Sequence, residues 1–185
     1  YQIKIRRKAA YVDWTKCTGC GLCMEKCPTK NAYDYFNFGA APTRAINIPF
    51  PQAIPKKAKI DPKFCRQFTK GKCGVCAKVC PTGAINYEQE DEIVTEEVGA
   101  IVVATGYGLL DQEKLPEYGG NRYPDVISGI QYERFLNASG PTSGHIIRPS
   151  DHEEPKTVVF VSCAGSRDKS IGVPYCSNFC CMYIA

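Results

Sequence analysis

Long apolar runs and a strong net charge are both missing from this chain of 185 residues. No stretch approaches the roughly 18 apolar residues that span a bilayer, and no charged and then apolar leader opens the sequence. The 23 basic and 19 acidic residues give a net charge of only +4, too little to indicate a nucleic-acid partner. We therefore expect a cytoplasmic protein with no membrane span and no nucleic acid.

The glycine-rich fingerprint G-x-G-x-x-G of dinucleotide-binding folds is also absent from the sequence. A nucleotide site of that kind would have to lie in sequence outside this chain, or not exist. The chain starts at Tyr1 rather than Met and stops in the apolar residues that precede Ala185. Natural C-termini are usually polar and exposed, so we expect a piece of a longer protein.

Cysteine, in contrast, is abundant, with 12 residues. In a reducing cytosol clustered thiols indicate metal or redox chemistry more often than disulfides. The first cysteine motif has the spacing C-x2-C-x2-C-x3-C-P, which is typical of bacterial ferredoxins that bind two [4Fe–4S] clusters. The cysteines of this first motif are Cys17, Cys20, Cys23 and Cys27, followed by Pro28.

A second copy of the motif follows, with its first gap enlarged from two residues to seven. A longer loop can still return its cysteine to the same site, because loop closure costs little more as length grows. By analogy with bacterial ferredoxins, the fourth cysteine of each motif serves the other cluster. One cluster is then held by Cys17, Cys20, Cys23 and Cys80, and the other by Cys65, Cys73, Cys76 and Cys27.

Zinc is the main alternative for these eight cysteines. A zinc site uses four ligands, so one such site would leave four ordered cysteines and both prolines without a role. The connection between the two motifs, Tyr33 to Pro55, is rich in aromatic residues and proline. It predicts a packed segment with little regular structure.

Beyond residue 90 the sequence predicts strands and helices. Alternation over Ile93–Val98 favours a strand, and the apolar runs Ala100–Ala104 and Thr157–Ser162 favour strands buried on both faces of a parallel sheet. Helices are predicted near Gly129–Asn137 and Ser177–Ala185. Together they indicate a Rossmann-type α/β half domain.

Four cysteines remain in this last part: Cys163, Cys176, Cys180 and Cys181. Their spacing is not a standard motif, although four thiols are the number that a third cluster needs. Vicinal cysteines point in different directions on a helix, so one of the pair could simply be buried. A redox-active dithiol at Cys180–Cys181 is a further alternative.

The combination resembles the A-subunit of heterodisulfide reductase, an iron–sulfur flavoprotein of methanogens and related anaerobes. The resemblance spans the whole chain and is most specific after the ferredoxin motifs. It is carried by the run Glu96–Tyr107, by Val161–Asp168 and by Tyr175–Tyr183.

The resemblance implies a thioredoxin-reductase-like FAD/NAD(P)-binding domain of Rossmann type, incomplete here, with an α+β ferredoxin-like domain inserted into it. Residues 1–90 would form this two-cluster insert and residues 91–185 part of the flavoprotein domain. The resemblance also implies that Cys163, Cys176, Cys180 and Cys181 bind a third [4Fe–4S] cluster. Ala104, Thr105 and Gly106 match the Ala-Thr-Gly turn beside the flavin, although a generic strand end would read the same.

By the same resemblance, FAD in the full-length protein splits the electrons of a two-electron donor between ferredoxin and the heterodisulfide of coenzymes B and M. The implied partners are other reductase subunits, a hydrogenase or dehydrogenase donor, and ferredoxin. This segment would supply one-electron transfer. The alternatives are a stand-alone polyferredoxin without flavin and a flavoprotein subunit of a quinone-interacting or sulfur-oxidising complex.

Overall fold

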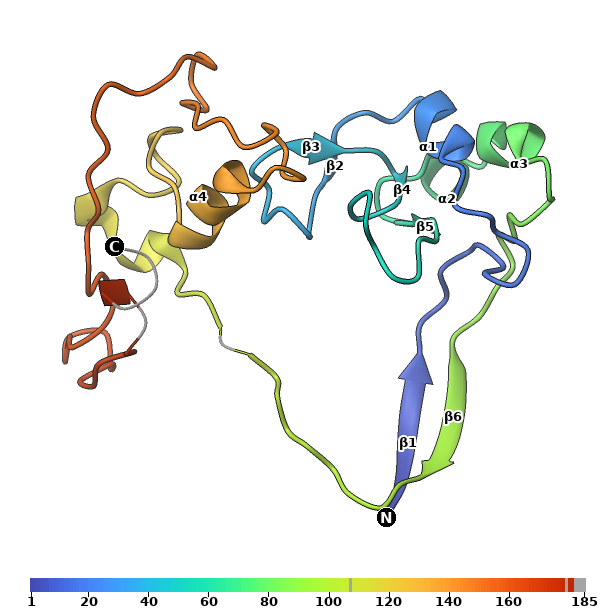
Figure 1. The fold of residues 1–185 in the computed structure, drawn as a ribbon, viewed down its shortest axis with the longest axis horizontal. Coiled ribbons are helices and arrows are strands. Elements are labelled where there is room, and N and C mark those ends of the chain that lie inside the picture. Colours follow the sequence, from blue (N-terminus) through green and yellow to red (C-terminus); the bar gives the residue numbers. More distant parts are fainter. Residues whose placement is uncertain (107, 179, 182–185) are drawn as a thin grey trace. The chain divides into compact units, whose positions relative to one another are not determined.

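The chain is divided into two compact units, Tyr1–Ala104 and Thr105–Ala185. The structure, a computed structural model, describes residues 1–106, 108–178 and 180–181 (Figure 1). Within these residues no helix has the length and apolar character needed to cross a membrane. The two units are described separately below.

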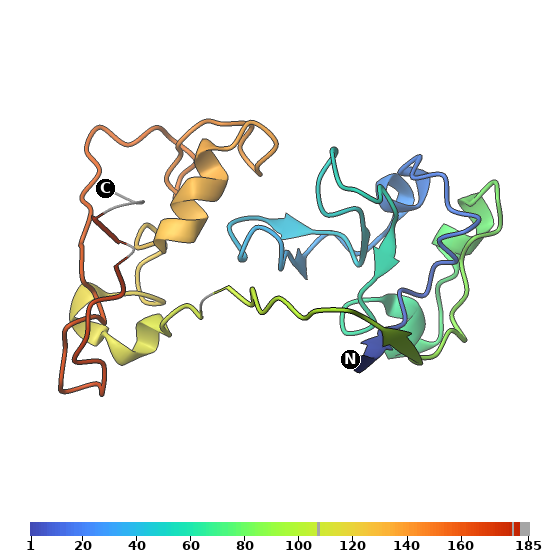
Figure 2. The same cartoon turned by 60° about the horizontal axis from the view of Figure 1, so that its bottom comes forward.

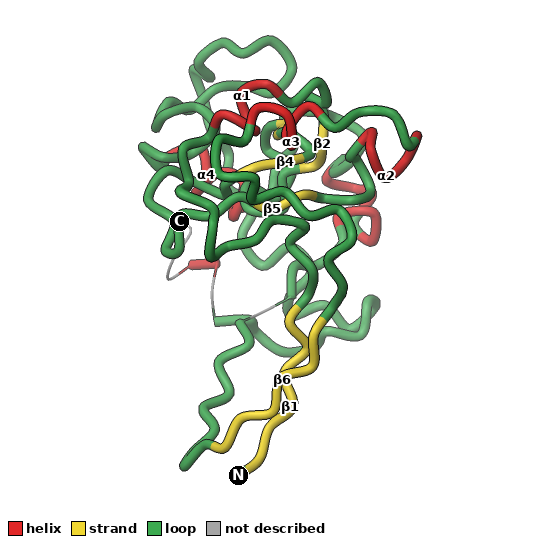
Figure 3. The backbone as a smooth tube through the Cα atoms, turned by 90° about the vertical axis from the view of Figure 1, so that its right-hand side faces the viewer, coloured by secondary structure: helices red, strands yellow, loops and turns green. Residues whose placement is uncertain are grey.

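An antiparallel ribbon joins the beginning and the end of the first unit. Strand β1 (Gln2–Arg7) pairs with β6 (Glu92–Glu97), as Figure 3 shows. Arg7 lies opposite Glu92, and their side chains form an exposed ion pair of 2.9 Å. The strand predicted over Ile93–Val98 is therefore confirmed. Because β6 pairs with β1, the first unit extends past residue 90.

The body of the first unit consists of short helices and two-residue strands around a small core. Helices α1 (Leu22–Lys26) and α3 (Val75–Val79) pack against each other, each directly before the last cysteine of its motif. The other elements are β2 (Ala32–Tyr33) with β3 (Pro42–Thr43), β4 (Ile46–Asn47) with β5 (Lys59–Ile60), and α2 (Arg66–Lys70).

The core of this unit is built largely from small residues and cysteines. Val12 and Ile46 are almost fully buried, and Val12 bridges to Ile85, which draws the chain before the first motif against the chain after the second. The connection between the motifs is mostly irregular, as predicted, but β4 adds Ile46 to the core. Figure 2 shows these elements from a second direction. The two motifs therefore share one core.

In the second unit, helix α4 (Gly129–Leu136) matches the helix predicted over Gly129–Asn137. Its N-terminus has a capping box, in which Ser128 and Gln131 satisfy each other's backbone N–H groups. Phe135 is the buried anchor of the helix, 2 % exposed. Two 3-10 turns precede it, η1 (Gln112–Lys114) and η2 (Pro116–Tyr118).

The two predicted buried strands are wrong for the described chain. Residues 100–104 and 157–162 form no ladder, and Val102 and Val159 are 88 % and 78 % exposed. A β-branched run becomes a strand only where neighbouring strands supply hydrogen bonds and burial. No described segment pairs with either run, so the predicted Rossmann-type sheet is not formed among the described residues.

The helix predicted over Ser177–Ala185 can be compared only in part. Ser177 and Asn178 are not helical, whereas Cys180 and Cys181 have helical backbone conformation. Residues 179 and 182–185 of this prediction lie outside the described residues.

Candidate metal centres

The first candidate site is a cavity of about 370 Å³, open solvent included. Val12, Ala58 and Ala84 supply apolar wall, and the cysteines bring sulfur from two distant parts of the sequence. The cysteines of this first cavity are Cys17, Cys20, Cys23 and Cys80. They are the four that the sequence predicts for one cluster.

The second candidate site is a cavity of about 310 Å³, bounded by apolar residues and by Arg66 and Tyr87. Its cysteines are Cys27, Cys65, Cys73 and Cys76. The structure therefore also brings together the second predicted set. Each cavity takes three cysteines from one motif and the fourth from the other.

The exchange of the fourth cysteine follows from how the two helices end. Cys27 directly follows α1 and Cys80 directly follows α3, and both have extended backbone, with ψ of 125° and 111°. The next residue is proline in both motifs, which cannot continue a helix. In each motif the backbone therefore leaves the helix at the last cysteine, whose side chain lines the neighbouring cavity.

The helices begin in the same way. The residues before α1 and α3 are Gly21 and Gly74, with φ of 83° and 77°. This left-handed conformation is costly for residues with a Cβ atom and open to glycine. It lets the chain turn between the second cysteine of each motif, Cys20 or Cys73, and the helix.

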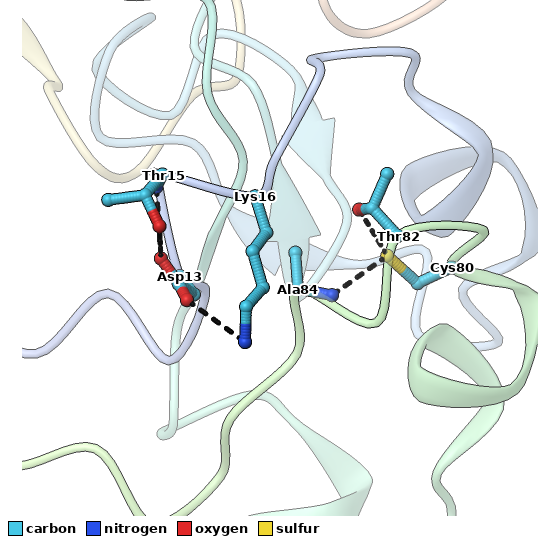
Figure 4. Close-up of polar contacts among 6 residues, drawn as sticks. All are labelled: Asp13, Thr15, Lys16, Cys80, Thr82 and Ala84. Carbon is cyan, nitrogen blue, oxygen red and sulfur yellow. Dashed lines mark hydrogen bonds and ion pairs between the residues drawn. The ribbon is translucent and has the colours of Figure 1, made fainter.

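Hydrogen bonds to sulfur differ between the cavities. In the first, Cys80 Sγ accepts from the Ala84 backbone N–H at 3.3 Å and lies 3.6 Å from the Thr82 hydroxyl (Figure 4). In the second, Cys76 Sγ lies 2.9 Å from the Tyr87 hydroxyl. Such donors favour the more negative state of a bound cluster and tune its potential.

The ionisation of the thiols follows their surroundings. Burial raises the pKa of Cys23 to about 11 and also raises the pKa of Cys76. Burial opposes ionisation of Cys80 as well, but hydrogen bonds from Thr82 and Ala84 outweigh it and lower the pKa. Thiols with raised pKa values keep their protons, and a metal that binds them must displace those protons.

The chain between the motifs places one cation beside a cysteine of each cavity. The Lys57 ammonium donates to the carbonyl of Cys17, and the Arg44 guanidinium donates to the carbonyl of Cys27 at 2.7 Å. These cations lie beside cysteines that would carry negative charge as ligands. No role for Lys57, Arg44 or Tyr87 is predicted from the sequence, and nothing in the spacing of the motifs indicates one.

The predicted third site is less assembled. Cys163 and Cys176 lie on loops that meet at Ser166, whose hydroxyl donates to the Tyr175 carbonyl at 3.0 Å and accepts from the Ser177 N–H at 2.9 Å. Neither of the two cavities described above is lined by any of the cysteines Cys163, Cys176, Cys180 and Cys181.

The predicted flavin-side turn of Ala104, Thr105 and Gly106 is exposed and falls at the boundary between the two units.

All twelve cysteines of the chain are free thiols. Among the described residues, no three His, Cys, Asp or Glu side chains close around a single metal ion. A cubane spreads its four cysteines farther apart than one ion does, which suits the two cavities.

The fold and the two cysteine cavities define the first unit as a ferredoxin-type iron–sulfur domain. A family profile described as "4Fe-4S binding domain" matches residues 10–31, which include the whole first motif.

Curated relatives extend the similarity to the whole chain. It is 48% identical over 184 residues to the A-subunit of the H(2):CoB-CoM heterodisulfide,ferredoxin reductase of Methanothermobacter thermautotrophicus, covering 100% of this chain and 27% of that protein. It is 45% identical over 183 residues to the A-subunit of the ferredoxin/F(420)H(2)-dependent CoB-CoM heterodisulfide reductase of Methanosarcina acetivorans, covering 98% of this chain and 22% of that protein.

A protein of Archaeoglobus profundus, described as similar to the heterodisulfide reductase A-subunit, is 40% identical, with 100% of this chain and 32% of that protein covered. The chain is thus related over its full length to the A-subunit of heterodisulfide reductase, as its motifs indicate. It spans 27%, 22% and 32% of the length of these three relatives, in the order given.

Proposed function

We propose that this chain is the electron-transfer segment of an iron–sulfur flavoprotein subunit of heterodisulfide reductase, an oxidoreductase. The observation that carries the proposal is the pair of cavities, each lined by four cysteines drawn from both motifs. The similarity to the reductase A-subunit over the whole chain supports it independently. The names of these relatives include CoB-CoM heterodisulfide and ferredoxin as the compounds on which they act.

Thiolates of Cys17, Cys20, Cys23 and Cys80 would hold one [4Fe–4S] cluster, and those of Cys65, Cys73, Cys76 and Cys27 the other. Such clusters supply one-electron transfer at potentials that the surrounding protein sets. The exchanged cysteines fasten the two motifs to each other. Since α1 packs on α3, the two sites are adjacent, which favours electron transfer between them.

For the third group, Cys163, Cys176, Cys180 and Cys181, we propose a further [4Fe–4S] site near the flavin of the complete protein. Ser166 supports this assignment, because it ties the loop after Cys163 to the loop around Cys176. A dithiol formed by Cys180 and Cys181 is the competing assignment.

The remainder of the proposal concerns the complete protein. The exposed apolar runs at residues 100–104 and 157–162 are suited to a Rossmann-type, FAD-binding sheet whose other strands belong to more sequence than this chain contains. Ala104, Thr105 and Gly106 would then border the flavin. FAD would divide electrons from a hydrogenase or dehydrogenase between ferredoxin and partner subunits that reduce the heterodisulfide.

A stand-alone polyferredoxin is the second candidate, because the described residues of the second unit contain no nucleotide-binding sheet. The sequence that precedes Tyr1 in the gene discriminates the two candidates. A strand followed by G-x-G-x-x-G supports the flavoprotein, and its absence contradicts it.

Iron and sulfide counting after anaerobic reconstitution tests the assignment of the cysteines. Three clusters predict about twelve irons per chain, and two predict about eight. Replacing Cys163 and Cys176 by Ser should lower the count by about four irons. A count of about eight that the replacements leave unchanged would show that the third group holds no cluster.

A further inference from the structure

The second motif carries an unusual excess of positive charge. Between Pro62 and Tyr87 the sequence contains no Asp or Glu, and its basic residues are Lys63, Arg66, Lys70, Lys72 and Lys78. All five are exposed. None of them takes part in an ion pair among the described residues.

The first motif treats its cations differently. Lys16 pairs with Asp13 at 3.4 Å, and Lys26 pairs with Glu25 at 2.7 Å (Figure 4 shows the Lys16 pair). Of the two motifs, only the second therefore carries positive charge between its first and last cysteines that is unpaired in the described part of the chain. Three of the five cations lie in the seven-residue loop between Cys65 and Cys73, where the first motif has only two residues.

The loop between Cys65 and Cys73, which contains α2, is held in place by its own contacts. Within α2, the Thr69 hydroxyl donates to the Cys65 carbonyl at 3.0 Å, and the Phe68 ring packs on Tyr11 with centroids 4.5 Å apart. The Gln67 side chain accepts from the Cys73 N–H at 3.0 Å. These contacts hold α2 against the second cavity, with its cations left to solvent.

Three of these cations, Arg66, Lys70 and Lys72, lie on or next to residues that line the second cavity. Arg66 lines the second cavity, and Lys70 follows it by four residues, on the same face of α2. Lys72 directly precedes the ligand candidate Cys73. A partner that binds these side chains is therefore brought to the edge of the second cavity.

We propose that α2 and the residues up to Lys72 form a docking surface for an acidic one-electron carrier protein, which exchanges electrons with the chain through the second cavity. The inference rests on the proposed function, because it requires a cluster in that cavity. Unpaired surface charge of one sign attracts a partner of the opposite sign and raises the association rate. The reaction moves one electron from the reduced carrier to the oxidised cluster, or in reverse, and no bond is made or broken.

The test uses the reconstituted chain and an acidic flavodoxin, reduced beforehand, whose absorbance is distinct from that of iron–sulfur clusters. The variant is Lys70→Glu with Lys72→Glu, and its matched control is Lys4→Glu with Lys8→Glu, which changes net charge equally on and just after β1. We expect the second-order rate constant at low salt to fall at least about tenfold in the variant and much less in the control.

High salt should remove the difference in rate constant between the variant and the unmodified chain, because the screening length shrinks from about 30 Å at 0.01 M to about 3 Å at 1 M. A neutral photoreduced flavin should reduce the variant and the unmodified chain at equal rates. The milder pair Lys70→Gln and Lys72→Gln should show a smaller loss in the same direction, which keeps the test valid if the charge reversal disturbs folding.

Three outcomes would overturn the proposal: an unchanged rate in the variant with full iron content, an equal loss in the control, or a shift of potential without a loss of rate at matched driving force. The last would mean that the cations only offset the charge of the thiolate ligands. An unmodified chain that binds no iron would overturn the proposed function itself, so the two failures are distinguishable.

Discussion

The two cysteine motifs have equivalent ligands and different surroundings. Each places a glycine before a short helix and sends its last cysteine to the other cavity. The first motif is compact, with its cations in ion pairs. The second motif has a longer first gap, and its basic side chains are in no ion pair among the described residues. The Tyr87 hydroxyl also contacts the sulfur of its Cys76. Equivalent sets of cysteines suit both cavities to the same kind of cluster, whereas the different surroundings would give the two bound clusters different potentials and different access to partners.

The largest expected effect is the loss of one cluster without the other. Cys20→Ser should remove the cluster of the first cavity, and Cys73→Ser that of the second, because each lines only one cavity. We expect each variant to lose about four irons. Iron analysis with EPR spectra of the reduced chains measures this. If both variants lose the same EPR signal, the two cavities do not act as separate sites.

The next effect concerns the turns that the two motifs share. Gly21→Ala and Gly74→Ala put a Cβ atom on a residue with φ near 80°, in open space at both positions. Each should lower the free energy of unfolding by about 1–2 kcal/mol, and by similar amounts. Denaturant unfolding of the two variants gives the comparison. Clearly unequal losses would break the equivalence of the two helix starts.

A smaller effect should separate the potentials of the two sites. Tyr87→Phe removes the hydroxyl 2.9 Å from Cys76 Sγ and leaves the ring packed on Phe68. Burial also raises the pKa of Tyr87, so its hydroxyl keeps the proton that it donates. We expect the potential of the second-cavity cluster alone to fall by tens of millivolts, where about 59 mV is a tenfold change for one electron.

An EPR-monitored redox titration measures this shift. Tyr11→Phe is the matched control, because the Tyr11 ring packs on the same Phe68. An unchanged potential in Tyr87→Phe, or equal shifts in both clusters, would contradict the role given to the hydroxyl.

The smallest effect is expected at the first cavity. Thr82→Val removes a hydroxyl 3.6 Å from Cys80 Sγ, a longer contact than that of Tyr87, and leaves the Ala84 N–H in place. The potential of the first-cavity cluster should fall by less than Tyr87→Phe lowers that of the second. The same titration, with Thr82→Ser as the variant that keeps the hydroxyl, measures it. A larger shift than that of Tyr87→Phe would reverse the comparison.

The sequence predicts the first unit well where the information is local. Spacing within each motif limits which of its cysteines can meet, and the exchange of Cys27 and Cys80 is expected by analogy with bacterial ferredoxins. The sequence predicts strand β6 over Ile93–Val98 and, in the second unit, helix α4 near Gly129–Asn137, within a residue of where the structure places each one. These features depend on neighbours in the sequence.

The features that sequence could not supply depend on distant neighbours. Tyr87, Arg44 and Lys57 approach cysteines or their carbonyls 11 to 40 residues away, and no periodicity reports such contacts. The runs at residues 100–104 and 157–162 failed as buried strands for the opposite reason. Their composition favours a sheet, but the described chain provides no partner strand.

The exchange of ligands between the motifs is the central claim, and the Cys27→Ser variant tests it most directly. Cys27 belongs to the first motif in sequence and lines the second cavity. The account predicts that the EPR signal lost or altered in Cys27→Ser is the one lost in Cys73→Ser, while the signal assigned by Cys20→Ser stays intact. Damage confined to the signal that depends on Cys20 would contradict it.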